Sequence, residues 1–128
     1  MNREIIFRGK PIGKGGIWVH GIGAYKTQTV EHIIVDAKGA SIAVVYLNQY
    51  TGLNDINGTK IFEGDIIEGL RYKHFVKYDN VQASYVAINV DYPEDSGCHI
   101  TEQWIKECDK VVIGNIYDNK ELIKQLQL

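Results

Sequence analysis

The stretch from Gln49 to Ile67 constrains the fold more than any other part of the chain. Three glycines, Gly52, Gly58 and Gly64, separate short apolar runs within it. Asn57 and Gly58 form a dipeptide that tight β-hairpins favour, because both residue types tolerate a positive φ angle. Almost every residue of the stretch therefore has a backbone task, which predicts a framework of short strands and turns.

Three carboxylates, Asp55, Glu63 and Asp65, lie close together in this stretch. Paired carboxylates serve as an acid and a base, or hold a divalent cation. Aspartates beside glycines also shape turns by accepting backbone hydrogen bonds. We favour the turn, because the chain shows no clear acidic partner elsewhere. The residues interpreted as a structural turn motif are Gly52, Asp55, Asn57, Gly58, Gly64 and Asp65.

The composition indicates one globular domain, spanning residues 1–128. Fourteen basic and sixteen acidic residues give a net charge of −2. Because nucleic-acid binders usually carry a basic excess, this balance argues mildly against such a role. No apolar run is long enough to cross a bilayer, and the N-terminus lacks the apolar core of a signal peptide. We therefore expect a soluble, cytoplasmic protein without membrane contact.

Strand patterns dominate the chain. Alternating or continuous apolar runs predict strands separated by glycine, asparagine and aspartate turns, and residues 9–16 read as a loop. A short helix is expected over residues 101–108, with Thr101 as its cap. A second helix is expected from Asp118, because an acidic residue follows at Glu121. The expected strands cover residues 3–8, 17–23, 32–35, 41–46, 71–78, 82–92 and 111–117.

The order of these segments resembles the YopX family of phage and prophage proteins. The segments that carry the resemblance are Arg3–Lys10, Gly16–Gly21, Gln49–Gly58, Ile61–Ile66 and Val112–Asn119, with Glu121 and Leu122 after them. The resemblance implies a phage or prophage origin, a β-rich fold and self-association. It supplies no catalytic residues, and residues 68–110 match none of its motifs.

The turn Glu63-Gly64-Asp65 is similar to the turn that starts a strand in many small SH3-like barrels. Together with the strand pattern, it leads us to expect a mainly β, YopX-like fold. The expected architecture is a small, partly open SH3-like barrel with long hairpins and a short C-terminal helix.

The spacing of the cysteines, histidines and glycine-rich segments matches no metal-binding, catalytic or phosphate-binding motif. Cys98, His99 and Cys108 do not form the two close pairs that are typical of structural zinc sites. Neither thiol shows the pattern of an activated nucleophile. Segments 13–16 and 21–23 do not fit phosphate-binding motifs. We expect free thiols, no metal, no cofactor and no catalytic residue.

One segment, Arg71 to Tyr78, combines basic and aromatic residues. On a strand, Arg71, Lys73, Phe75 and Lys77 share one face, whereas Tyr72, His74, Val76 and Tyr78 share the other. Cations beside aromatic rings suit single-stranded nucleic acid. An ordinary solvated strand over a core of tyrosines fits the acidic total better.

The sequence therefore favours a non-enzymatic phage or prophage accessory protein of the binding or scaffold type. A homo-oligomer is expected, and nucleic acid or a host or phage protein are its candidate partners. The alternative is a nucleic-acid-binding module that uses the strand 71–78.

Overall fold

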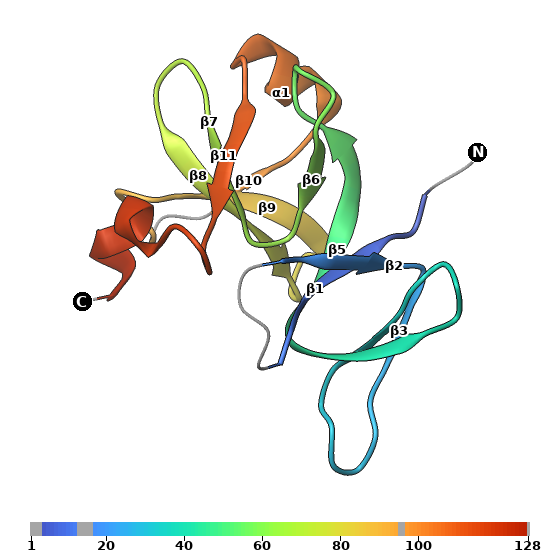
Figure 1. Ribbon diagram of the computed structural model, residues 1–128. Coiled ribbons are helices and arrows are strands. Elements are labelled where there is room, and N and C mark those ends of the chain that lie inside the picture. The colour runs from blue at the N-terminus through green and yellow to red at the C-terminus, as the bar shows by residue number, and fades with distance from the viewer. Residues whose placement is uncertain (1–3, 13–16, 95–96, 128) are drawn as a thin grey trace. The chain divides into compact units, whose positions relative to one another are not determined.

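The computed structural model describes residues 4–12, 17–94 and 97–127, with the backbone alone for residues 124–127. It is mainly β, with two antiparallel sheets that are not closed (Figure 1). This confirms the fold class expected from the sequence. The chain divides into two compact units, unit 1 (residues 1–52) and unit 2 (residues 53–128).

Unit 1 is built on a curved sheet with the strand order β2-β1-β5-β4-β3. Only Ile22 separates β2 from β3, so one bent segment pairs with β1 through its first half and with β4 through its second. This arrangement curves the sheet without closing it. Its strands are β1 (Phe7–Pro11), β2 (Val19–Gly21), β3 (Gly23–Tyr25), β4 (Ile33–Val35) and β5 (Ser41–Asn54), the last of which continues into unit 2.

At the first strand, the prediction of a loop from the local sequence was wrong. A loop was expected from Gly9, but β1 continues through Pro11. Gly9 lies so close to Ile34 and Val44 that a Cβ atom would stand 2.7 Å from both side chains. Glycine is therefore present for close packing, and it does not break the strand. The rest of the expected loop, residues 13–16, lies outside the described residues.

Unit 2 contains a second sheet with the strand order β10-β9-β8-β7-β11, and β6 pairs with β5. A short helix and a C-terminal 3₁₀ helix complete this unit. Its elements are β6 (Lys60–Phe62), β7 (Asp65–Glu68), β8 (Lys73–Asp79), β9 (Ser84–Asn89), β10 (Cys98–His99), α1 (Glu102–Glu107), β11 (Val111–Asn115) and η1 (Lys120–Gln127).

Apolar side chains cover both faces of the unit 2 sheet. Because neighbouring residues on a strand point to opposite faces, Ile66 and Ile67 enter different clusters. The first cluster includes Ile105 of α1, and the second includes Ile123 of η1. The first consists of Ile61, Ile67, Val76, Ala87, Ile100 and Ile105, and the second of Ile66, Val90 and Ile123, with Phe75, Ile116 and Leu122 packed on it.

The two expected helices have different outcomes. The helix near residue 101 is confirmed, and the Thr101 hydroxyl accepts a hydrogen bond from the Trp104 N–H at 3.1 Å. The C-terminal helix is a 3₁₀ helix beginning at Lys120. Asp118 lies in the preceding turn, where its carboxylate accepts from the Asn115 side-chain amide at 3.1 Å. Leu126, expected on its apolar stripe, has no described side chain. Within the described residues, no helix has the length and apolar character needed to cross a membrane.

Candidate functional site

The centre of the turn motif is a loop closed by Asp55 and Gly58. One Asp55 carboxylate oxygen accepts from the backbone N–H groups of Asn57 and Thr59, each at 2.9 Å. Gly58 has a φ of +86°, whereas Asn57 is not among the described residues with positive φ. Both residues therefore belong to the turn, Gly58 through its positive φ and Asn57 through its backbone N–H. The geometry fits a three-residue hairpin loop that ends in a left-handed glycine.

The second oxygen of Asp55 reaches a distant strand. It accepts from the backbone N–H of Val112, in β11, at 2.9 Å, and the Ile56 N–H donates to the Lys110 carbonyl at 3.2 Å. Asp55 is 6% exposed. Both carboxylate oxygens are therefore engaged by backbone donors, which fastens the turn to the start of β11.

The other motif residues also have backbone roles. The Asp65 carboxylate, 2% exposed, accepts from the Phe62 N–H, which precedes Gly64, at 2.8 Å. Gly64 has a φ of +88° and its N–H and carbonyl bond to Val76 and Ile116. Gly52, with a φ of +91°, lies in β5 at the boundary between the two units.

Unit 2 contains a buried cation that the sequence did not reveal. Lys110 is 2% exposed, and its ammonium donates to the Tyr72 carbonyl at 2.9 Å. The same ammonium lies 3.2 Å from Nδ1 of His74 and 5.1 Å from the centre of the Trp104 ring. We call these four residues the Lys110 centre. Lys110 shows no sequence signal that distinguishes it from the surface lysines.

Burial controls the charge state of this centre. Burial, and then the Lys110 ammonium, lower the pKa of His74 from 6.5 to about 4. The imidazole is therefore neutral near pH 7, and its Nδ1 can accept from the lysine. Burial also lowers the pKa of Lys110, against the opposing effects of Cys108, Cys98 and Glu68. The arrangement holds a cation with neutral acceptors, and it shields the imidazole from solvent.

The basic and aromatic residues of segment 71–78 are only partly brought together. Lys73, Phe75 and Lys77 alternate along β8, while Arg71 lies exposed before the strand. The Lys73 ammonium is 3.6 Å from the Glu68 carboxylate. Phe75 packs against the cluster of Ile66, Val90 and Ile123. The strand therefore offers an exposed cation at Lys77 but uses its phenylalanine ring in core packing.

Comparison with known families settles what kind of chain this is. A family model described as YopX protein matches residues 13–124. The chain belongs to the YopX family. No curated protein matches this YopX-family chain. The matched range includes most of each compact unit and the whole turn motif, so the Asp55 turn and β11, which this turn fastens, lie inside it.

The thiols and histidines that the structure describes in this YopX-family chain are not grouped as metal ligands. Cys98 is exposed and Cys108 is half-buried, and both are free thiols. Burial raises the pKa of Cys98, which disfavours its reactive thiolate. The Ser84 hydroxyl is 3.2 Å from Nδ1 of His99 on the exposed β9–β10 edge. No group of three potential metal ligands occurs among the residues that the structure describes.

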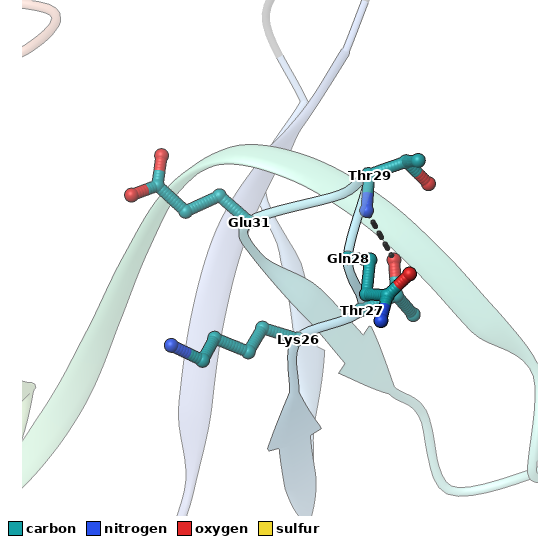
Figure 2. Close-up of a pocket in the computed structure, with 5 residues that line it drawn as sticks. All are labelled: Lys26, Thr27, Gln28, Thr29 and Glu31. Carbon is teal, nitrogen blue, oxygen red and sulfur yellow. Dashed lines mark hydrogen bonds between the residues drawn. The ribbon is translucent and has the colours of Figure 1, made fainter.

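One open hollow of the YopX fold lies on the loop between β3 and β4 (Figure 2). Its volume is about 730 Å³. The Thr27 hydroxyl accepts from the N–H groups of Thr29 and Val30 at 3.3 and 2.9 Å, which shapes the loop. The lining residues, all solvent-exposed, are Lys26, Thr27, Gln28, Thr29 and Glu31. A hollow of exposed side chains on one loop does not select a ligand.

Proposed function

We propose that this YopX-family chain is a non-enzymatic phage or prophage accessory protein of the host-cell cytoplasm. In this role it is a self-associating, β-rich binding or scaffold domain. Family membership supports the origin. The non-enzymatic role is supported by Asp55 and Asp65, whose buried carboxylates accept from backbone N–H groups.

Exposed isoleucines in unit 1 carry the proposal of self-association. Ile17 is 77% exposed, Ile22 is 68% exposed and Ile12 is 56% exposed. A contiguous patch of exposed apolar side chains often marks a contact site, and we propose that these three isoleucines form one. Since Ile22 joins two strands of one sheet, it occupies a fixed position from which a second copy can be contacted.

Side chains are a better basis for this association than strand edges. On β11, the outward N–H groups of Val112 and Asn115 already donate to the side chains of Asp55 and Asn119. The pairing register of β11 also shifts between Val112 and Gly114. Short or irregular edges, and edges whose donors are occupied, resist the addition of another strand. The terminal strands β2, β3 and β10 have three residues or fewer.

The test is the mass of the protein in solution for the wild type, Ile22→Asp and a matched control, Val81→Asp. Val81 is 94% exposed in the turn between β8 and β9. We expect light scattering to give a multiple of the chain mass for the wild type and the control, and one chain for Ile22→Asp. A monomeric wild type, or equal masses for all three proteins, would contradict the proposal.

Nucleic-acid binding through segment 71–78 is the second candidate, and the exposed Arg71 and Lys77 favour it. Their positive charges would attract phosphates. If this segment binds, Lys77→Ala should weaken the retention of a labelled oligonucleotide at low salt. Unchanged retention would remove the candidate.

A further inference from the structure

The sheet of unit 1 has two chemically different faces. Residues directly opposite one another in an antiparallel pair share a face. Arg8 stands opposite both His20 and Asn48, and Lys10 stands opposite Tyr46. The intervening residue, Gly9, points toward Ile34 and Val44. One face is therefore apolar and packed, whereas the other carries basic, aromatic and amide side chains.

Trp18 lies on this second face, against two cations. The Arg8 guanidinium carbon is 4.7 Å from the centre of the Trp18 ring, and the Lys10 ammonium is 5.7 Å from it. Arg8 is 8% exposed, and its Nε donates to the Asn48 side-chain oxygen at 3.3 Å. Arg8 therefore supports the ring from a fixed position. Lys10 and Trp18 remain partly exposed, and His20 is exposed.

The two units carry net charges of opposite sign, which the net charge of the whole chain does not show. Unit 1 carries six lysines and arginines against three acidic residues, a net charge of +3. Unit 2 carries eight against thirteen, a net charge of −5. An anionic polymer is therefore attracted to unit 1 and repelled by unit 2. The β8 segment lies in the acidic unit.

We propose that the face of unit 1 formed by Lys10, Trp18, His20 and Tyr46 binds single-stranded nucleic acid. Lys10 attracts the phosphates, and the Trp18 ring provides a surface on which a base stacks. His20 donates a hydrogen bond to a phosphate or base. A single strand is the favoured ligand because its bases are free to stack on a ring, whereas those of a duplex are paired inside.

This face differs from segment 71–78 in the position of its aromatic ring. Trp18 is held by cations on a sheet face, whereas Phe75 packs into the core beside η1. The proposed surface therefore does not depend on the strand identified from the sequence.

Tryptophan fluorescence gives a direct readout. The chain has two tryptophans, so Trp104→Phe leaves Trp18 as the only emitter. We expect oligo-dT to quench Trp18 emission at low salt, and the affinity to fall steeply as salt rises. Lys10→Ala should weaken binding by roughly tenfold, as expected for the loss of a close phosphate contact. Retention of a labelled oligonucleotide by the wild type checks that Trp104→Phe has not disturbed the result.

Two further lysine variants complete the test. Lys38→Ala removes a positive charge from the turn 36–39 of unit 1 and is the control of equal charge, so it should bind nearly as the wild type does. Lys77→Ala removes one from β8 and distinguishes this face from segment 71–78, because only binding through that segment depends on Lys77. No quenching and no retention at low salt would overturn the proposal. So would loss of binding in Lys77→Ala with normal binding in Lys10→Ala. If polyglutamate binds equally well without quenching Trp18, the face is a docking site for acidic protein and the proposal is wrong.

Discussion

At the scale of single residues, two turns of this chain form a natural comparison. Asp36 and Asp55 each accept, through one carboxylate oxygen, from the N–H groups two and four residues later, at 2.9 Å. The glycines that follow, Gly39 and Gly58, both have a φ of +86°. Only Asp55 is buried and bonds through its other oxygen to Val112. The difference between the two sites therefore isolates that long-range contact.

We predict that Asp55→Ala lowers the free energy of unfolding by about 3 kcal/mol, and Asp36→Ala by about 1 kcal/mol. Each loses local turn bonds, but Asp55→Ala also leaves the part-buried Val112 N–H without its charged acceptor, a loss of about 1.5–3 kcal/mol. Urea unfolding of both variants measures the difference. Equal losses would show that the Val112 contact contributes nothing.

At the scale of elements, the Lys110 centre joins the segment after α1 to β8. The Lys110 N–H donates to the Ile105 carbonyl of α1 at 3.0 Å, while its ammonium reaches Tyr72 and His74. The His74 and Trp104 rings meet edge to face at a centroid distance of 5.4 Å. A single residue, Lys110, therefore connects helix α1 to strand β8 and the residue before it.

This connection predicts a loss of stability in acid. Above pH 7.5, His74 is neutral in both the folded and unfolded states, so it adds no pH dependence. Between pH 6.5 and about 4, the unfolded chain binds a proton that the folded chain excludes. We expect the free energy of unfolding to fall over this interval by up to about 3 kcal/mol through His74.

Unfolding curves from pH 7.5 to 4.5 test this prediction, with His74→Gln as the control. Glutamine keeps a neutral acceptor near Lys110 but does not titrate. The variant should therefore lose less stability in acid than the wild type. Parallel pH profiles for the two proteins would contradict the assignment.

Elements that depend on the local sequence pattern were predictable. Features that depend on side chains far away in the sequence were not. The alternation in residues 71–78 and the glycine turns around Asp55 indicated a mainly β fold. The pattern could not reveal that Gly9 continues a strand, because Ile34 and Val44 create the need for glycine there. Likewise, Lys110 is buried by side chains contributed from β8 and α1, and η1 covers Phe75.

At the scale of the whole molecule, the two units differ in how many apolar side chains they bury. Among the described residues, four of the fifteen buried apolar side chains belong to unit 1 and the rest to unit 2. Because apolar burial is the main favourable term in folding, unit 2 has the larger stabilising contribution. Each unit contains one tryptophan, Trp18 or Trp104, so each can be followed separately.

We predict that unit 1 unfolds at a lower urea concentration than unit 2. Emission from Trp18, measured in Trp104→Phe, should change first, and emission from Trp104, measured in Trp18→Phe, should change later. Circular dichroism of the wild type should span both transitions. Coincident transitions in all three measurements would indicate a single cooperative unit.

The bond between Asp55 and the Val112 N–H also has a consequence for the order in which the chain is made. Val111, Val112 and Ile113 form a β-branched apolar run of the kind that aggregates when its edge is open. The aspartate that occupies this edge lies fifty-seven residues earlier in the sequence. During synthesis, the protecting turn therefore leaves the ribosome before the strand that it protects. The run of residues 111–113 therefore emerges after Asp55, whose carboxylate occupies its edge, has already been made.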